Sequence, residues 1–232
     1  QIQNLNTHFR LGAPSTYGIY MKDTISNIDS SLIKINTDDD TSSNNYGIYV
    51  DSSSANEIPN TINNSVINLS GAENNYGVYF EKSSGIIKYS DVEVDGNNNE
   101  GYGIALKADT ASTTTTDTVI SFTHHTEARD IISNDGSINF ISLGFTERQK
   151  IKITGASQSA NNGVFTIYDV SATELTLIKN DVLTTEAAGA TVTVQELYSV
   201  DLVFNQIGGS SNVIASVDNN DFFSIEAANN RL

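Results

Sequence analysis

The chain contains no cysteine, few basic residues and no long apolar run. Without cysteine it has neither disulfide bonds nor thiolate metal ligands to hold it together. None of its apolar runs approaches the roughly 18 residues of a transmembrane helix, so the sequence predicts no insertion into a membrane. No signal peptide is evident, and because the chain starts with Gln1 instead of Met we interpret it as a processed mature form or a fragment.

The charge balance is strongly acidic. Twelve Lys and Arg residues stand against 28 Asp and Glu residues, which gives a formal net charge of −16 over 232 residues. This charge repels phosphate backbones, so we expect no nucleic-acid partner. Hydrophobic residues make up only 38% of the chain. Much of the remainder is Asn, Ser, Thr, Asp and Gly, which suit turns and strand edges better than helices.

A short phrase, Tyr-Gly-Ile-Tyr or a close variant, recurs along the first half of the chain. It begins at Tyr17, Tyr46, Tyr76 and Tyr102, in steps of 29, 30 and 26 residues. Self-similarity at such a period is typical of an array in which each repeat buries its apolar face against the next. The sequence therefore predicts a solenoid.

Each repeat contains two strand-like runs separated by polar turns, such as Tyr46–Val50 followed by Ser65–Leu69. Parallel stacking of equivalent runs predicts an all-β, right-handed parallel β-helix. The tyrosines that open the phrases would stack in a ladder, and Asn45 and Asn75 would stack at the corner before it. Because the two tyrosines of a phrase are three residues apart, we expect one to point inward and the other outward.

The repeats are then interrupted. Residues 126–195 have their own rhythm of short strands and Gly or Asn turns, which predicts an inserted small antiparallel β-barrel or sandwich. After it, Tyr198 opens a degraded phrase, and we expect it to continue the tyrosine ladder. Residues 1–125 and 196–232 would then form the β-helix, and the insert would project from one corner.

Two resemblances support this division. The segments Asn44–Val50 and Asn64–Leu69 resemble coils of large bacterial surface proteins of the autotransporter-passenger and repeat-adhesin type. In those families the β-helix is a stalk from which functional parts hang. The segments Lys150–Gly155, Asn161–Ile167 and Leu183–Val192 resemble a small β module of phage virion and bacterial extracellular proteins. That resemblance implies a role in decoration or contacts and no catalytic residues.

The sequence offers one cluster of metal-ligand residue types, His124, His125, Glu127 and Asp130. Adjacent histidines on a strand point to opposite faces, so they do not readily bind one ion. We therefore interpret this segment as the loop where the repeats meet the insert, and predict no metal or cofactor there.

Calcium is the one cofactor for which weak candidates exist. Asp95, Asn97 and Asn99 carry oxygen ligands at alternate positions, but the glycine and the twelfth residue do not fit an EF-hand loop. Asp38 and Asp40 are a second candidate corner. An Asn-rich turn and a solvated charge run are the preferred interpretations of these segments.

Three functions remain open. Strand edges left open at the ends of a β-helix favour head-to-tail assembly. We therefore expect a non-enzymatic extracellular or cell-surface protein that associates with itself into a fibril. The first alternative is a glycan-binding adhesin or a tail-fibre or tailspike fragment, since tyrosines stack on sugars. The second is a polysaccharide lyase or hydrolase using Glu93 and Asp95, for which loss of activity in Glu93→Gln would be evidence.

Overall fold

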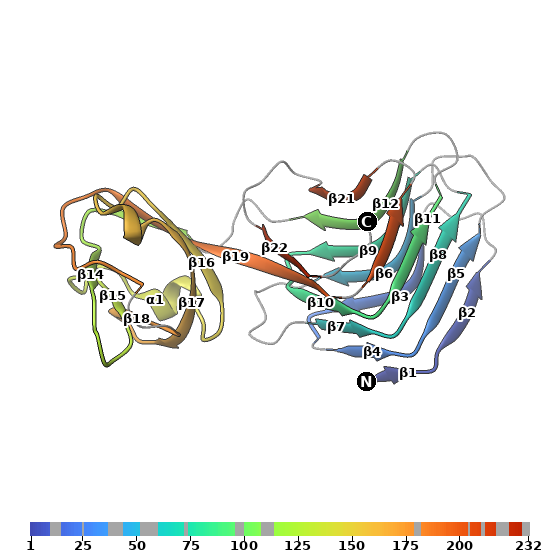
Figure 1. Ribbon diagram of the computed structural model, residues 1–232, viewed down its shortest axis with the longest axis horizontal. Helices are drawn as coiled ribbons and strands as arrows, with labels where there is room; N and C mark the ends of the chain where they lie inside the picture. The colour runs from blue at the N-terminus through green and yellow to red at the C-terminus, as the bar shows by residue number, and fades with distance from the viewer. Residues whose placement is uncertain are drawn as a thin grey trace. The chain divides into compact units, whose positions relative to one another are not determined.

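The computed structural model is almost entirely β and divides into two compact units (Figure 1). Unit 1 comprises Gln1–Asp109 and Ser199–Leu232, and unit 2 comprises Thr110–Tyr198. The residues that the structure describes are 1–9, 15–24, 26–36, 44–51, 60–71, 74–95, 100–107, 114–178, 182–203, 205–209, 212–216 and 223–228.

Unit 1 is built from three parallel sheets of stacked strands (Figure 1). Sheet A contains β1 (Ile2–Gln3), β4 (Asn27–Asp29), β7 (Asn60–Asn63), β10 (Gly85–Lys88) and part of β19 (Val192–Val203), with β22 (Phe223–Ala228) pairing on β19. Sheet B contains β2 (Asn6–Phe9), β5 (Leu32–Asn36), β8 (Val66–Ser70), β11 (Asp91–Val94) and β20 (Gln206–Gly209). Sheet C contains β3 (Ser15–Lys22), β6 (Asn44–Asp51), β9 (Asn74–Glu81), β12 (Glu100–Lys107) and β21 (Asn212–Ser216).

The chain visits sheets A, B and C in turn and then returns to sheet A one strand further along, so that successive coils lie on one another. The expectation of stacked parallel strands is confirmed. Each complete coil has three strands, however, and the two-run prediction missed those of sheet A. Strands β4 and β10 bury only Ile28 in the first case and Gly85 with Ile87 in the second, too few inward residues for a visible alternation.

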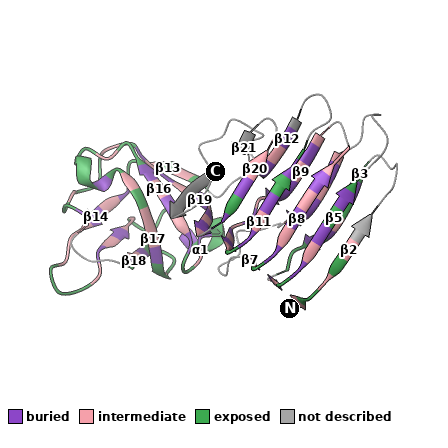
Figure 2. Cartoon of the chain, turned by 45° about the vertical axis from the view of Figure 1, so that its right-hand side comes forward, coloured by how far each residue is buried: buried purple, intermediate pink, exposed green. Residues whose placement is uncertain are grey.

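Aliphatic side chains from all three sheets form one buried core. Figure 2 shows buried residues recurring along the strands of these sheets. Ile33, Ile67 and Val92 of sheet B lie in register and are fully buried, as are Ile48 and Val78 of sheet C. Each apolar residue thus contacts its counterpart in the next coil. The repeat period of the sequence is the length of chain needed to complete one coil.

Unit 2 is an antiparallel arrangement around a separate apolar core. Its strands are β13 (Thr114–Asp117), β14 (Ser121–Thr123), β15 (Ile131–Ser133), β16 (Lys150–Thr154), β17 (Gly163–Val170), β18 (Glu174–Leu177) and the first half of β19. A four-residue helix, α1 (Phe140–Leu143), and a 3-10 turn at Ser159–Asn161 complete it. Asn139 caps α1 by accepting a hydrogen bond from the Ser142 N–H at 3.0 Å.

Unit 2 begins earlier than residue 126, where the insert was expected to start. Strand β13 pairs with β19, and β14 pairs antiparallel with β15, so neither joins the parallel sheets. Ile120 and Phe122 are buried in the second core. Residues up to 125 were expected to belong to the β-helix. The run at 118–122 has the composition of a strand, but composition does not distinguish a parallel partner from an antiparallel one.

Candidate functional site

The outer face of sheet C carries two rows of tyrosines, which together we call the tyrosine ladder. The first row stacks Tyr17, Tyr46, Tyr76 and Tyr102, with ring centroids 5.0, 5.1 and 5.3 Å apart and ring planes within 13° of parallel. The expected ladder of these four residues is therefore present. Their backbones are in direct register from coil to coil, which brings the rings face to face.

The second row consists of Tyr20, Tyr49 and Tyr79, with centroids 5.4 and 4.9 Å apart. It contacts the first row edge to face, as between Tyr46 and Tyr49, whose centroids are 4.9 Å apart at 81°. Aromatic pairs favour both stacked and edge-to-face geometries. The prediction that one tyrosine of each phrase points inward is wrong, because both rows lie on the same outer face.

The glycine between the tyrosines explains this difference. In β6 both Gly47 and Ile48 are buried, so the strict alternation of faces is lost by one position and Tyr49 returns to the side of Tyr46. A Cβ on Gly47 would lie 2.5 Å from the carbonyl oxygen of Gly77 in the next coil and 2.5 Å from Cγ2 of Ile67. Only glycine fits where the backbones approach so closely, which accounts for its recurrence in the phrase.

A row of charged residues borders the second tyrosine row. Lys22, Asp51, Glu81 and Lys107 occupy equivalent positions in successive coils. The Lys107 Nζ lies 3.0 Å from the Glu81 carboxylate, and the Lys22 Nζ lies 3.7 Å from that of Asp51. The Tyr20 hydroxyl donates to Asp51 at 3.3 Å, and the Tyr49 hydroxyl donates to Glu81.

These contacts alter the acidity of the groups involved. Burial, with the neighbouring Tyr76 and Tyr17, raises the pKa of Tyr46 to about 12. Burial and the hydrogen bond to Glu81 also raise the pKa of Tyr49. Burial alone would raise the pKa of Glu81, but the hydrogen bonds from Tyr49 and Lys107 outweigh it and lower the pKa. At neutral pH Tyr46 and Tyr49 are thus neutral phenols, and Glu81 beside Tyr49 is an ionised carboxylate.

Tyr198 does not continue the ladder. Strand β19, which contains it, pairs with β10 in sheet A, so that Val200 lies opposite Gly85. The fifth strand of sheet C is β21, in which Asn212 lies opposite Tyr102. The aligned pairs Ile104 with Ile214 and Ala105 with Ala215 are the sequence signal that identifies this strand. The sequence did not predict this strand's place in sheet C, because other residues stand there in place of the tyrosine and glycine of the phrase.

The corner before the ladder contains the expected asparagine pair. Asn45 and Asn75 are fully buried, and the Asn45 side-chain amide donates to the Asn75 carbonyl at 3.0 Å. The Asn75 amide in turn donates to the backbone carbonyl of Asp95 at 2.9 Å. In the neighbouring coils Thr16 is in register with Asn45, and Gly101 is in register with Asn75. The asparagine ladder is therefore two residues long.

The corner between sheets A and B has a second ladder that the sequence interpretation missed. Ser31, Ser65, Ser90 and Asn205 are buried there, and each backbone N–H of the three serines donates to the side-chain oxygen of the next residue at 2.9–3.2 Å. The residues directly before the three serines, Ser30, Asn64 and Tyr89, have left-handed backbone conformations. A serine every 25 to 34 residues in such polar turns gives little signal in a sequence rich in serine.

The acidic candidates divide into described and undescribed residues. Asp38, Asp40, Asn97 and Asn99 lie outside the residues that the structure describes. Asp95 and Glu93 are exposed and line a shallow hollow on the outer face of sheet B. The other described residues that line the hollow are Lys34, Ile35, Asn36, Asn68, Leu69 and Ser70. Within the described ranges, no group of three or more His, Asp or Glu residues is arranged to bind a metal ion.

Asp130 organises the segment of the two histidines. Its buried carboxylate accepts hydrogen bonds from the backbone N–H groups of His125, Val182 and Leu183 at 2.7–2.9 Å, and lies 3.2 Å from the His124 Nδ1. Burial opposes ionisation, but these hydrogen bonds outweigh it and lower the pKa of Asp130. The segment is thus a loop held by a structural carboxylate. It joins β14 to β15 within unit 2, however, and is not the place where the repeats meet the insert.

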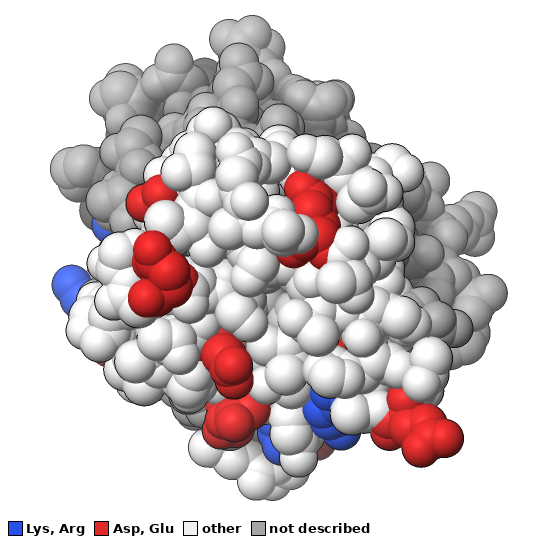
Figure 3. All heavy atoms as spheres, turned by 90° about the vertical axis from the view of Figure 1, so that its left-hand side faces the viewer, with Lys and Arg blue, Asp and Glu red and all other residues white. Residues whose placement is uncertain are grey.

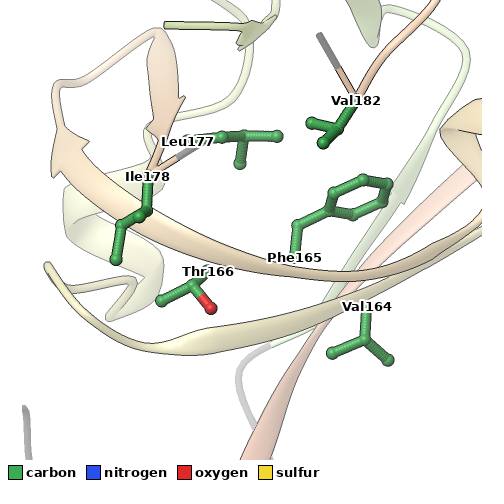
Figure 4. Close-up of a pocket in the computed structure, with 6 residues that line it drawn as sticks. All are labelled: Val164, Phe165, Thr166, Leu177, Ile178 and Val182. Atoms are coloured by element: carbon green, nitrogen blue, oxygen red, sulfur yellow. The ribbon is translucent and has the colours of Figure 1, made fainter. Parts of the chain in front are cut away.

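An apolar pocket of about 160 Å³ lies between β17 and β18 of unit 2 (Figure 4). Its lining residues are Val164, Phe165, Thr166, Leu177, Ile178 and Val182. The side chains of Phe165, Leu177 and Val182 converge in it (Figure 4). Among the described lining residues Thr166 has the one polar side chain, and none of these six carries an acid, base or charged group suited to catalysis.

The surface chemistry agrees with the composition. On the face drawn in Figure 3, acidic side chains form several separate groups and basic side chains are few. No helix among the described residues is long and apolar enough to cross a membrane. Comparison of the sequence with models of known protein families and with curated proteins finds no match.

Proposed function

We propose that this chain is a non-enzymatic extracellular structural protein that associates with itself head to tail into a fibre or surface appendage. In this proposal unit 1 is a right-handed parallel β-helix, like the stalks of the bacterial surface proteins it resembles. Unit 2 is a small β-barrel or sandwich inserted into that stalk, and the fibre displays it. Neither part requires a cofactor.

The first coil carries the main support for this proposal. Among the described residues, β1, β2 and β3 each have a strand neighbour on one side only. Ile2 is partly exposed, whereas Ile28 and Ile62 in the same column of sheet A are fully buried. Likewise Tyr20 is 49% exposed and Tyr79 only 6%. Another coil laid on this end would bury the same columns of side chains and pair the open strand edges.

The test compares assembly of the wild-type chain with two lysine variants. Ile2→Lys puts a charge where the next coil would pack, whereas Gln3→Lys puts the same charge on the exposed side of the same strand. We expect fibres in electron micrographs, and large species in sedimentation, for the wild type and Gln3→Lys but not for Ile2→Lys. A wild-type chain that stays monomeric at high concentration would contradict the proposal.

The hollow on sheet B favours a second candidate, a glycan-binding adhesin. Lys34, Asn68 and Glu93 lie side by side in successive strands of its floor. Such a set of donors and acceptors suits the hydroxyl groups of a sugar. A glycan array would test this candidate. Defined hits that disappear in Asn68→Ala but persist in Asn74→Ala, on the outer face of sheet C, would support it, and absence of hits would remove it.

A further inference from the structure

The amino-acid inventory makes tyrosine the main oxidisable side chain of this protein. The chain has no cysteine, no tryptophan and a single methionine, but ten tyrosines. That methionine, Met21, is only 5% exposed. Thiols and thioethers, which ordinarily react first with peroxides, therefore offer little competition. Seven of the ten tyrosines belong to the tyrosine ladder.

The ladder holds these rings at contact distance. Each ring of the first row is within 5.3 Å, centroid to centroid, of a ring in a neighbouring coil. Tyr17 also lies 5.4 Å from both Tyr20 and Tyr49. Phenoxyl radicals formed on two adjacent rings of this group would be in contact without any movement of the backbone. Stacking between coils thus supplies the proximity that coupling of two radicals needs.

The borders of the ladder supply proton acceptors. A phenol that loses an electron must also lose its proton, and the Tyr20 and Tyr49 hydroxyls already donate to the carboxylates of Asp51 and Glu81. An oxidant also has access to one end of the rows, because Tyr17 is 39% and Tyr20 is 49% exposed. The other rings of the ladder are partly buried, and Tyr79 is only 6% exposed.

We propose that the tyrosine ladder is a site of oxidative tyrosine cross-linking, with hydrogen peroxide as the oxidant and a haem peroxidase as the catalyst. Two tyrosines each give one electron and one proton, and one peroxide takes up both pairs and becomes two molecules of water. The two radicals form a carbon–carbon bond between ring positions next to the hydroxyls. The hydrogens on those carbons move to the oxygens and restore two phenols.

The product is a dityrosine bridge that joins neighbouring coils of one molecule. A bridge between Tyr17 and Tyr46 closes a loop of 29 residues. Such a bridge restricts the unfolded chain in the way a disulfide does, so it stabilises the fold. In a chain without cysteine it would be a covalent tie for the parallel sheets. This inference concerns single molecules and does not depend on assembly.

The test treats the purified full chain, at low protein concentration, with a haem peroxidase and hydrogen peroxide. We expect dityrosine fluorescence, a monomer lighter by two hydrogen atoms, and a higher melting temperature. After proteolysis, the peptide that contains Tyr17 and Tyr20 should be joined to the peptide that contains Tyr46 and Tyr49.

Two double variants decide whether the ladder is responsible. Tyr17→Phe with Tyr20→Phe removes the exposed end of the ladder and keeps the rings stacked. Tyr89→Phe with Tyr168→Phe removes two tyrosines of similar exposure, 57% and 50%, that belong to neither row. The first variant should lose the intramolecular product and the second should retain it. Equal yields in both, or a product found only between molecules, would overturn the proposal.

Discussion

At the scale of single residues, the recurring glycine has the most demanding position in unit 1. Gly18, Gly47 and Gly77 each lack room for a Cβ, which would approach both a backbone carbonyl of the next coil and a core side chain within about 2.5 Å. The neighbouring carbonyl belongs to the glycine of the next repeat. A glycine is therefore needed at this position in each coil to let the backbones of adjacent coils approach. This explains why the phrase recurs in the sequence.

Gly47→Ala is predicted to destabilise unit 1 by about 1–3 kcal/mol, because the added methyl group overpacks a dense interior. Gly208→Ala is the matched control, since the nearest heavy atom to its Cβ would be 4.0 Å away. Urea unfolding followed by the tyrosine fluorescence of the ladder would measure both. Equal midpoints for the two variants would contradict the close approach of the coils.

The raised pKa of Tyr46 predicts a loss of stability in alkali. The folded value is about 12 against 10.0 for an unperturbed tyrosine, so the fold favours the neutral phenol. Its contribution to stability is complete below pH 10 and is lost as the pH rises through 12. Tyr46→Phe removes this ionisation, so its free energy of unfolding should fall less than that of the wild type between pH 10 and 12. Parallel curves for the two proteins would contradict the prediction.

At the scale of secondary-structure elements, side-chain ladders at the corners fix where each strand ends. The buried side chains at the corner between sheets A and B accept hydrogen bonds from backbone N–H groups. At the corner before sheet C the Asn45 amide donates to the Asn75 side chain, and the Asn75 amide donates to the backbone carbonyl of Asp95. An unsatisfied buried polar group is costly. The corners consequently select small polar residues, whereas the sheets select aliphatic ones.

Asn75→Asp is predicted to destabilise unit 1 by about 2 kcal/mol or more, because it buries a carboxylate and removes the donor to the Asp95 carbonyl. Asn74→Asp makes the same change one residue earlier, where the side chain is only partly buried, and should cost less. Thermal melts above pH 6 would compare the two. Equal melting temperatures for the two variants would show that the buried asparagine pair does not stabilise this corner.

At the scale of the whole molecule, the charge of −16 opposes contact between copies. If copies stack end to end, screening should promote assembly, because the Debye length falls from about 30 Å at 0.01 M salt to about 8 Å at 0.15 M. Light scattering should therefore rise with sodium chloride over this range. Less assembly at the higher salt concentration would contradict a contact made by apolar ends and strand edges.

Calcium chloride at matched ionic strength separates screening from specific binding. Equal scattering in the two salts indicates screening. A larger effect of calcium that a chelator reverses would point to the candidate oxygen ligands at Asp38, Asp40 and Asp95.

The sequence alone determined the repeat, its period, the β character and the stacked tyrosines and asparagines. Those features depend on contacts between equivalent residues of neighbouring coils. Such contacts require the same residue types at the same position of every repeat, so they are visible in the sequence. The tertiary structure decided the rest. It decided that both tyrosine rows share one face and that residues 114–123 pair within unit 2. It also decided that the fifth strand of sheet C is β21 and not the strand that contains Tyr198. These outcomes depend on backbone geometry and on the choice of strand partner, and neither leaves a repeating pattern in the order of amino acids.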